Sequence, residues 1–174
     1  MKRWLMLMFS SLWLGLTLAQ IAPSPTEINT YQGLFAAVAE GNLEQVQNLI
    51  ADGADLEERD AQGRTPLLVA AHFSHDDVAR VLLEAGADPN ALDQQRYDLI
   101  TIAAVNNDVE MIKVGLEHGA DPANITSPYD GTALIAAAHL GHIETVQTLI
   151  DAGAPLDHVN NLNWTALIEA IVLG

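Results

Sequence analysis

The chain has 174 residues, no cysteine, and 23 acidic against seven basic residues, which gives a formal net charge of −16. So few cations argue against binding to nucleic acid or to an anionic membrane, because both need a positive surface. The lack of cysteine excludes a disulfide framework and a cysteine nucleophile. The charge favours a basic protein partner, and the alternative is an acidic surface that serves solubility alone.

Residues 1–19 are predicted to be a secretory signal peptide. Lys2 and Arg3 precede an apolar run from Trp4 to Leu18, and small residues up to Ala19 suit cleavage after that position. An uncleaved membrane anchor is the alternative, but the run is shorter than the roughly 20 residues that a span needs. An exported chain without cysteine favours the periplasm over the extracellular space. Removal of this segment would leave a charge of −18 and no membrane contact.

Residues 20–29 contain Pro23 and Pro25, show no periodicity, and are predicted to be a linker. The first predicted helix pair follows in residues 30–61. It has Gln32-Gly33 where later units have a stronger helix start, and it carries polar residues such as Glu40, Asn42 and Glu44. A terminal unit needs a polar outer face, so we expect an N-terminal cap here.

The second helix pair, in residues 62–95, shows the unit most clearly. Thr65 and Pro66 are typical of a helix start, because the hydroxyl caps a free N–H and proline has none to lose. Asp76 suits the start of a second helix, and Gly86 suits the left-handed position after its end. Two such short helices cannot bury their own apolar face, so the unit needs neighbours.

The neighbours recur at a fixed period. Gly-Ala pairs begin at Gly53, Gly86, Gly119 and Gly153, in steps of 33, 33 and 34 residues. Such a period is typical of a stacked repeat array. The segments Thr65-Pro66-Leu67, Ala70-Ala71 and Gly86 to Asn90 resemble the ankyrin repeat family, and the resemblance covers roughly Thr30 to the C-terminus.

The resemblance implies an all-α, helix-turn-helix solenoid of four repeats plus a C-terminal half repeat, with short β-hairpin or extended fingers. The ankyrin repeat domain would span residues 30–174, with repeats at about 30–61, 62–95, 96–128 and 129–162 and a partial repeat at 163–174. The finger in residues 122–130 is one residue longer than the others and holds two prolines, so we expect it to differ in shape.

The third repeat departs most from the family pattern. Asp98 and Asn107 replace the threonine cap and the corner glycine, and Gly115 stands where the other repeats have leucine. We expect either a cavity or a close helix approach at Gly115, and the weakest unit of the array. The family's usual histidine after the helix start is also replaced, which removes a common hydrogen bond between repeats; the residues there are Leu68, Thr101, Ile135 and Ile168.

The last segment, residues 163–174, supplies one helix and no partner helix. Ile168, Ile171 and Leu173 would then form an uncovered apolar edge. Two explanations stay open: the sequence is the front part of a longer protein, or another chain covers the edge, as it would in a self-associating array.

Candidate partner-binding residues come from columns that vary while the helix-forming residues repeat. In ankyrin-like proteins such columns line the concave groove and the finger bases, and the resemblance implies the same here. Aromatic and arginine side chains anchor interfaces, although a ring can instead pack on its own finger. The candidates are Tyr31, Arg64, His72, Phe73, Tyr97, Asn106, Tyr129, His139, Leu140 and Trp164.

No metal, cofactor or catalytic role is predicted. His72 with His75, and His139 with His142, have a spacing that suits two metal ligands, but the pairs lie two repeats and about 20 Å apart. The corner histidines His75 and His142 also have a structural explanation in the family. The sequence lacks a G-x-S-x-G motif, a P-loop and a dinucleotide fingerprint.

We therefore expect a non-catalytic protein-interaction module in an exported compartment, with its partner on the concave face. The alternatives are an accessory or protective factor for an exported enzyme and a self-associating structural array. The first alternative follows from the resemblance, since exported bacterial ankyrin-like proteins include a partner of catalase in oxidative-stress defence.

Overall fold

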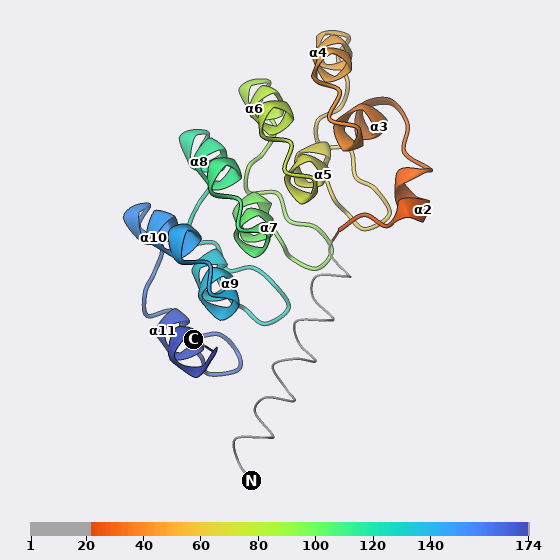
Figure 1. The fold of residues 1–174 in the computed structure, drawn as a ribbon. Coiled ribbons are helices and arrows are strands. Elements are labelled where there is room, and N and C mark those ends of the chain that lie inside the picture. Colours follow the sequence, from red (N-terminus) through yellow and green to blue (C-terminus); the bar gives the residue numbers. More distant parts are fainter. Residues whose placement is uncertain (1–21, 174) are drawn as a thin grey trace.

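A computed structural model describes residues 22–173 of the chain, so the predicted signal peptide lies outside the described part. Four antiparallel helix pairs and a final single helix follow one another along an arc (Figure 1). The inner row consists of α3 (Gly33–Ala39), α5 (Pro66–His72), α7 (Leu99–Asn106), α9 (Ala133–Leu140) and α11 (Ala166–Leu173). The outer row consists of α4 (Leu43–Ala51), α6 (Asp76–Glu84), α8 (Val109–Glu117) and α10 (Ile143–Asp151). The all-α solenoid expected from the sequence is confirmed.

Each inner helix packs on the inner helices before and after it, and the outer helices stack in the same way. Small residues allow the inner helices to lie close together, because alanine has no side chain beyond Cβ. Ala70 and Ala71 on α5, and Ala103 and Ala104 on α7, are completely buried. The buried side chains of all repeats form one continuous apolar core.

The inner helices begin at side-chain caps that recur with the repeat. The hydroxyl oxygens of Thr65 and Thr132 each accept a backbone N–H three residues ahead, at 3.4 Å. In the third repeat Asp98 Oδ1 accepts the N–H of Thr101 at 2.8 Å, and Asn107 adopts the left-handed conformation with φ 57°. Asp98 thus takes the role of the threonine cap, and Asn107 takes that of the corner glycine. The third repeat therefore keeps both its N-terminal cap and its left-handed corner.

Gly115 marks a close approach of helices and not a cavity. A Cβ atom at this position would lie 2.8 Å from Cδ2 of Leu99, which is completely buried on α7. Leu99 therefore fills the space that a leucine at position 115 would occupy. Of the two sequence expectations for this position, the close approach is confirmed.

The fingers are turns, and of the two expected conformations, β-hairpin or extended, the β-hairpin does not form within residues 22–173. The only bridge in that range joins Thr126 to Gly131. It lies in the finger that was expected to differ, where Ser127 and Asp130 have φ of 65° and 52°. All fingers point to the concave side of the array, beside the inner helices (Figure 1).

The segment expected to be a linker contains a one-turn helix, α2 (Pro25–Ile28). Ser24 and Glu27 cap it reciprocally: the hydroxyl of Ser24 accepts the N–H of Glu27 at 3.3 Å, and Glu27 Oε2 accepts the N–H of Ser24 at 2.8 Å. No helix within residues 22–173 is long and apolar enough to cross a membrane.

Candidate functional site

The finger turns decide where the candidate residues lie. Asp60 Oδ1 accepts the N–H groups of Gln62 and Arg64, and Asp93 Oδ1 accepts those of Gln95 and Tyr97. The same turn recurs at Asn160, whose Oδ1 accepts the N–H groups of Leu162 and Trp164. Each turn folds the finger back, so that the residue just before the next inner helix lies against the repeat stack.

Arg64 is at the centre of a buried charge cluster at the N-terminal end of the array. Its guanidinium donates to Asp60 Oδ2 at 2.7 Å and to Glu27 Oε1 at 2.6 Å. Tyr31 donates its hydroxyl hydrogen to the same Asp60 oxygen at 2.6 Å. The Arg64 residue is 1% exposed and therefore offers a partner almost no surface. The cluster fixes α2 and the first repeat to the second.

Hydrogen bonding within this cluster outweighs the effect of burial on its pKa values. Burial alone would raise the pKa of Asp60, but bonds from Tyr31 and Arg64 hold it below its usual range. Burial alone would lower the pKa of Arg64, but the bond to Asp60 raises it. Hydrogen bonds with Ser24, followed by those with Arg64, lower the pKa of Glu27. The cluster therefore stays ionised down to unusually low pH.

His72 lies near this cluster and is kept neutral. Burial, followed by the positive charge of Arg64, lowers the pKa of His72 to about 3. Its Nε2 atom is buried and has no hydrogen-bond partner within the described residues. An imidazole of this kind is uncharged at neutral pH and acts as part of the packing.

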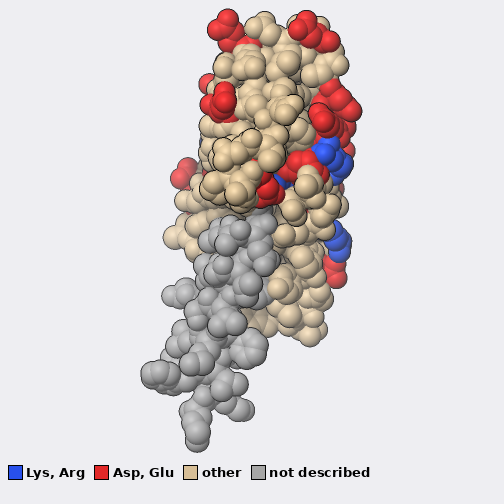
Figure 2. Space-filling view, turned by 90° about the vertical axis from the view of Figure 1, so that its right-hand side faces the viewer, with Lys and Arg blue, Asp and Glu red and all other residues tan. Residues whose placement is uncertain are grey.

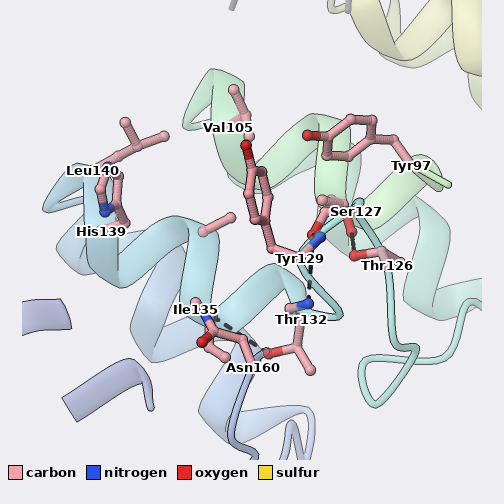
Figure 3. Close-up of a pocket in the computed structure, with 13 residues that line it drawn as sticks. Tyr97, Val105, Thr126, Ser127, Tyr129, Thr132, Ile135, His139, Leu140 and Asn160 are labelled. Carbon is pink, nitrogen blue, oxygen red and sulfur yellow. Dashed lines mark hydrogen bonds between the residues drawn. The ribbon is translucent and has the colours of Figure 1, made fainter. Parts of the chain in front are cut away.

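A groove on the concave side brings together four of the ten candidates. It has a volume of about 50 Å³ and lies between α7, α9 and the finger that joins them. Tyr97, Tyr129, His139 and Leu140 line it, and they come from different parts of the sequence (Figure 3). This is the largest grouping of candidates in the described structure.

The walls of the groove are mainly apolar. Val105 on α7 and Ile135 and Ala136 on α9 lie along it, and the Tyr129 ring stands between the two helices with its hydroxyl end toward Val105 (Figure 3). Thr101 and Thr126 join α7 to the finger through a 2.8 Å bond between their hydroxyl groups. Thr101 occupies the position at which the family usually has histidine. At this position the hydrogen bond between the two hydroxyl groups joins α7 to the finger.

The two tyrosines have different environments. Tyr97 is 5% exposed, and burial, followed by the charge of Asp93, raises its pKa to about 12. Tyr129 is half-buried, and its backbone N–H donates to Ser127 Oγ at 3.3 Å. Tyr129 is therefore the more accessible ring, and Tyr97 forms part of the wall.

His139 links the groove to the last helix. Its Nδ1 atom lies 2.8 Å from Oε2 of Glu169 on α11, and the two side chains are 8% and 3% exposed. Glu169 was not among the candidates. It stands in an otherwise apolar column, with Val69, Ile102 and Ala136 at the same position of other repeats. A single carboxylate in such a column is the sequence signal that could have revealed a buried pair.

The three remaining candidates lie apart from the groove and from the charge cluster. The Phe73 ring stacks on His75 with centroids 5.9 Å apart, and Asn106 is exposed with its amide donating to the carbonyl of Ala71 at 3.2 Å. Trp164 is half-buried beside the turn at Asn160. The structure thus distributes the ten candidates over one groove, one buried cluster and three separate positions.

The corner histidines contact the backbone of the preceding repeat. His75 Nε2 lies 3.3 Å from the carbonyl oxygen of Ala39, and His142 Nδ1 lies 2.9 Å from that of Ala104. These contacts support their structural explanation. Within residues 22–173 no three histidine or acidic side chains are grouped so as to hold a metal ion.

Charge is unevenly distributed over the finger side of the array. Figure 2, which looks onto the finger side of the array, shows mostly uncharged surface in the lower half where the described residues are visible, and carboxylates toward the upper end. Exposed arginines are engaged: Arg80 pairs with Glu110 and Glu117, and Arg96 pairs with Asp130.

Comparison with known proteins identifies the class that this fold defines. A family model described as ankyrin repeats (three copies) matches residues 15–93 and 99–174, and the chain belongs to this family. Such repeats indicate a protein–protein interaction module and suggest a protein without catalytic activity of its own.

Two similar proteins are regulatory subunits by name. Over 50 residues the chain is 46% identical to protein phosphatase 1 regulatory subunit 27 of Homo sapiens and 47% identical to that of Mus musculus. The matched stretch is 29% of this chain, and the chain spans about a third, 32%, of the length of these curated relatives.

Proposed function

We propose that this protein is a non-catalytic interaction module that holds an extended segment of a protein partner in the groove between α7 and α9. The observation that carries the proposal is the convergence of Tyr97, Tyr129, His139 and Leu140 on one apolar groove. Aromatic rings that line a concave apolar site bury a large area at low entropic cost. A groove of about 50 Å³ suits one short aliphatic side chain of the partner.

The proposal includes export to the periplasm, which rests on the charge and apolar pattern of residues 1–19. The acidic chain favours a partner with a basic surface around the segment that enters the groove. The relatives described as regulatory subunits are in keeping with a protein that acts through another protein.

The test is to fill the groove without disturbing the core. Ala136 lines the groove and is half-buried, so tryptophan at this position would place its indole in the groove. Ala36, half-buried at the same position of the first repeat, gives the matched control Ala36→Trp. The purified protein and both variants serve as bait in a periplasmic extract, and captured proteins are quantified by mass spectrometry.

We expect one protein to be captured by the wild type and by Ala36→Trp, and to be lost with Ala136→Trp. Circular dichroism checks that both variants keep the helical content of the wild type. Equal capture by all three baits would remove the groove from consideration, and capture lost by both variants would show that tryptophan disturbs the array in general.

A further inference from the structure

The groove between α7 and α9 contains a buried hydrogen-bond donor. Asn160 lines the groove and is 3% exposed (Figure 3). Its Oδ1 atom accepts the two N–H groups of its own finger turn. Its Nδ2 atom is buried as well, but has no hydrogen-bond partner among the described residues. A buried donor without an acceptor is costly, so this amide group needs an explanation.

The finger turn does not require an amide at this position. Asp60, Asp93 and Ser127 hold the same turn in the other fingers, each through one oxygen atom that accepts two backbone N–H groups. An aspartate or a serine at position 160 would therefore form the turn equally well. What distinguishes Asn160 from these three residues is the pair of hydrogens on its Nδ2 atom, which can only donate.

The first finger shows how a side chain of the preceding repeat can bond to the turn residue. Tyr31 donates its hydroxyl hydrogen to Oδ2 of Asp60 at 2.6 Å. Asn160 holds the position of Asp60 in the last finger, and the residue that then corresponds to Tyr31 is Gly131. Gly131 has no side chain, so the preceding repeat offers Asn160 no such bond at this position.

Neither the backbone nor the packing requires glycine at position 131. Its φ angle lies outside the left-handed region that favours glycine. A Cβ atom at this position would lie 3.5 Å from Oγ of Ser127 and 4.0 Å from Cγ2 of Ile135, which are ordinary contacts. Gly131 and Asn160 both line the groove. The groove is therefore open beside the residue at which a larger side chain could have stood.

The surroundings of the Asn160 amide favour an acceptor without charge. The walls of the groove are mainly apolar, and the chain has a formal net charge of −16. His139, which lines the same groove, already lies 2.8 Å from the buried carboxylate of Glu169. A second carboxylate, brought by a partner, would lose its water in an acidic protein, which is far more costly than the burial of a neutral oxygen.

We infer that Asn160 selects the partner side chain that enters the groove, by donating a hydrogen bond from Nδ2 to an uncharged oxygen at the end of a short side chain such as threonine or asparagine. The inference rests on the proposed function and adds an oxygen to the short side chain that the groove would hold. A site built to bond an oxygen rejects a side chain of the same shape that lacks it, because the buried donor then stays unpaired.

The probe is a phage-displayed library of random peptides. Peptides are selected on the wild-type protein and depleted on Ala136→Trp, in which the groove is filled, so that the remaining peptides bind the groove. One of these is synthesised with a fluorescent label. Each threonine or asparagine of the peptide is then replaced by the side chain of the same shape without the oxygen, valine for threonine and leucine for asparagine. Fluorescence anisotropy measures the affinity of each peptide.

Asn160→Ser removes the donor and keeps the turn, because Ser127 holds the same turn in the third finger. The control is Asn161→Ser, which changes an exposed asparagine of the same finger. Circular dichroism checks that both variants keep the helices. A nitrogen–proton correlation spectrum of the wild type observes the side-chain amide of Asn160 directly, so the test does not depend on the folding of the variant.

We expect the replacement at one peptide position to weaken binding to the wild type and to Asn161→Ser by at least about ten-fold. With Asn160→Ser the same replacement should change the affinity by about two-fold or less, because the donor is gone. In the spectrum, the original peptide should shift the amide protons of Asn160, and the peptide without the oxygen should not.

Three results would overturn the inference. If every replaced peptide binds the wild type as tightly as the original does, the groove binds peptides without selection by Asn160. If the ten-fold difference persists in Asn160→Ser, or if the amide protons of Asn160 do not respond to the original peptide, another group makes the selection. If no peptide distinguishes the wild type from Ala136→Trp, the proposed function and this inference fail together.

Discussion

Replacement of Arg64 by methionine tests how strongly the buried charge cluster holds the N-terminal end of the array. The Arg64 side chain is 2% exposed and bonds to both Asp60 and Glu27. Removal of one partner of a buried ion pair costs about 3–5 kcal/mol, because the remaining charge is left buried. Asp60 would keep the bonds from Tyr31 and from the backbone, and Glu27 is 29% exposed to water. We therefore expect the free energy of unfolding to fall by about 3 kcal/mol, at the lower end of this range.

Urea unfolding followed by far-ultraviolet circular dichroism measures this loss. With a slope of about 2 kcal/mol per M, the midpoint should fall by about 1.5 M. The control is Arg80→Met, because Arg80 also pairs with two carboxylates but lies in solvent at 37% exposure. Its midpoint should stay close to that of the wild type.

The direction of the pKa shifts of Asp60 and Glu27 determines how the stability provided by the cluster depends on pH. The pKa values of Asp60 and Glu27 lie below their usual range in the folded protein. Their stabilisation is therefore fully present above the ordinary carboxylate pKa and is lost as the pH falls through the folded values. The difference between the wild type and Arg64→Met should shrink in acid. An unchanged midpoint at neutral pH, or a difference that persists in strong acid, would refute the reasoning.

Two further substitutions test other parts of the array. Gly115→Leu gives the third repeat the leucine that the other repeats have, but Leu99 already occupies that space. We therefore expect unfolding in urea to show a free energy of unfolding that is lower by about 1–3 kcal/mol, and a more stable variant would contradict the close approach. Burial, followed by the charge of Asp108, raises the pKa of Asp76 to about 6, so ionised Asp76 opposes folding at neutral pH. Asp76→Asn should raise the thermal midpoint at about pH 7 and leave it unchanged below about pH 3, where Asp76 is protonated in both states. A larger gain in acid would contradict this assignment.

Local rules explain why the helices could be predicted from the sequence. A cap, an apolar stripe and a left-handed stop recur in phase, and Thr65 and Thr132 act as caps as expected. In the third repeat, the residue types alone did not show that the cap and the left-handed stop are kept, and whether this repeat is the weakest unit stays a prediction. Asp98 caps as threonine does, and Asn107 tolerates the left-handed conformation as glycine does.

The burial of the candidates could not be predicted in the same way, because it depends on how each finger folds back. The column that contains Arg64 and Tyr97 varies between repeats, as exposed binding positions do. The turns at Asp60 and Asp93 nevertheless bring both side chains into the stack. Helix α2 was missed because four residues show no periodicity, and only the reciprocal cap of Ser24 and Glu27 signals it.

The stacking of the helices has a consequence for how the array comes apart. Each unit packs only on adjacent units. A change at one interface therefore alters the stability of the neighbouring units most and that of distant units least. The Arg64 cluster secures the first interface, whereas the groove is built at the third, between α7 and α9. Opening of the first interface would therefore leave the contacts that build the groove in place. A bound partner would act as a clamp on the two C-terminal repeats, and it would slow amide hydrogen exchange there first.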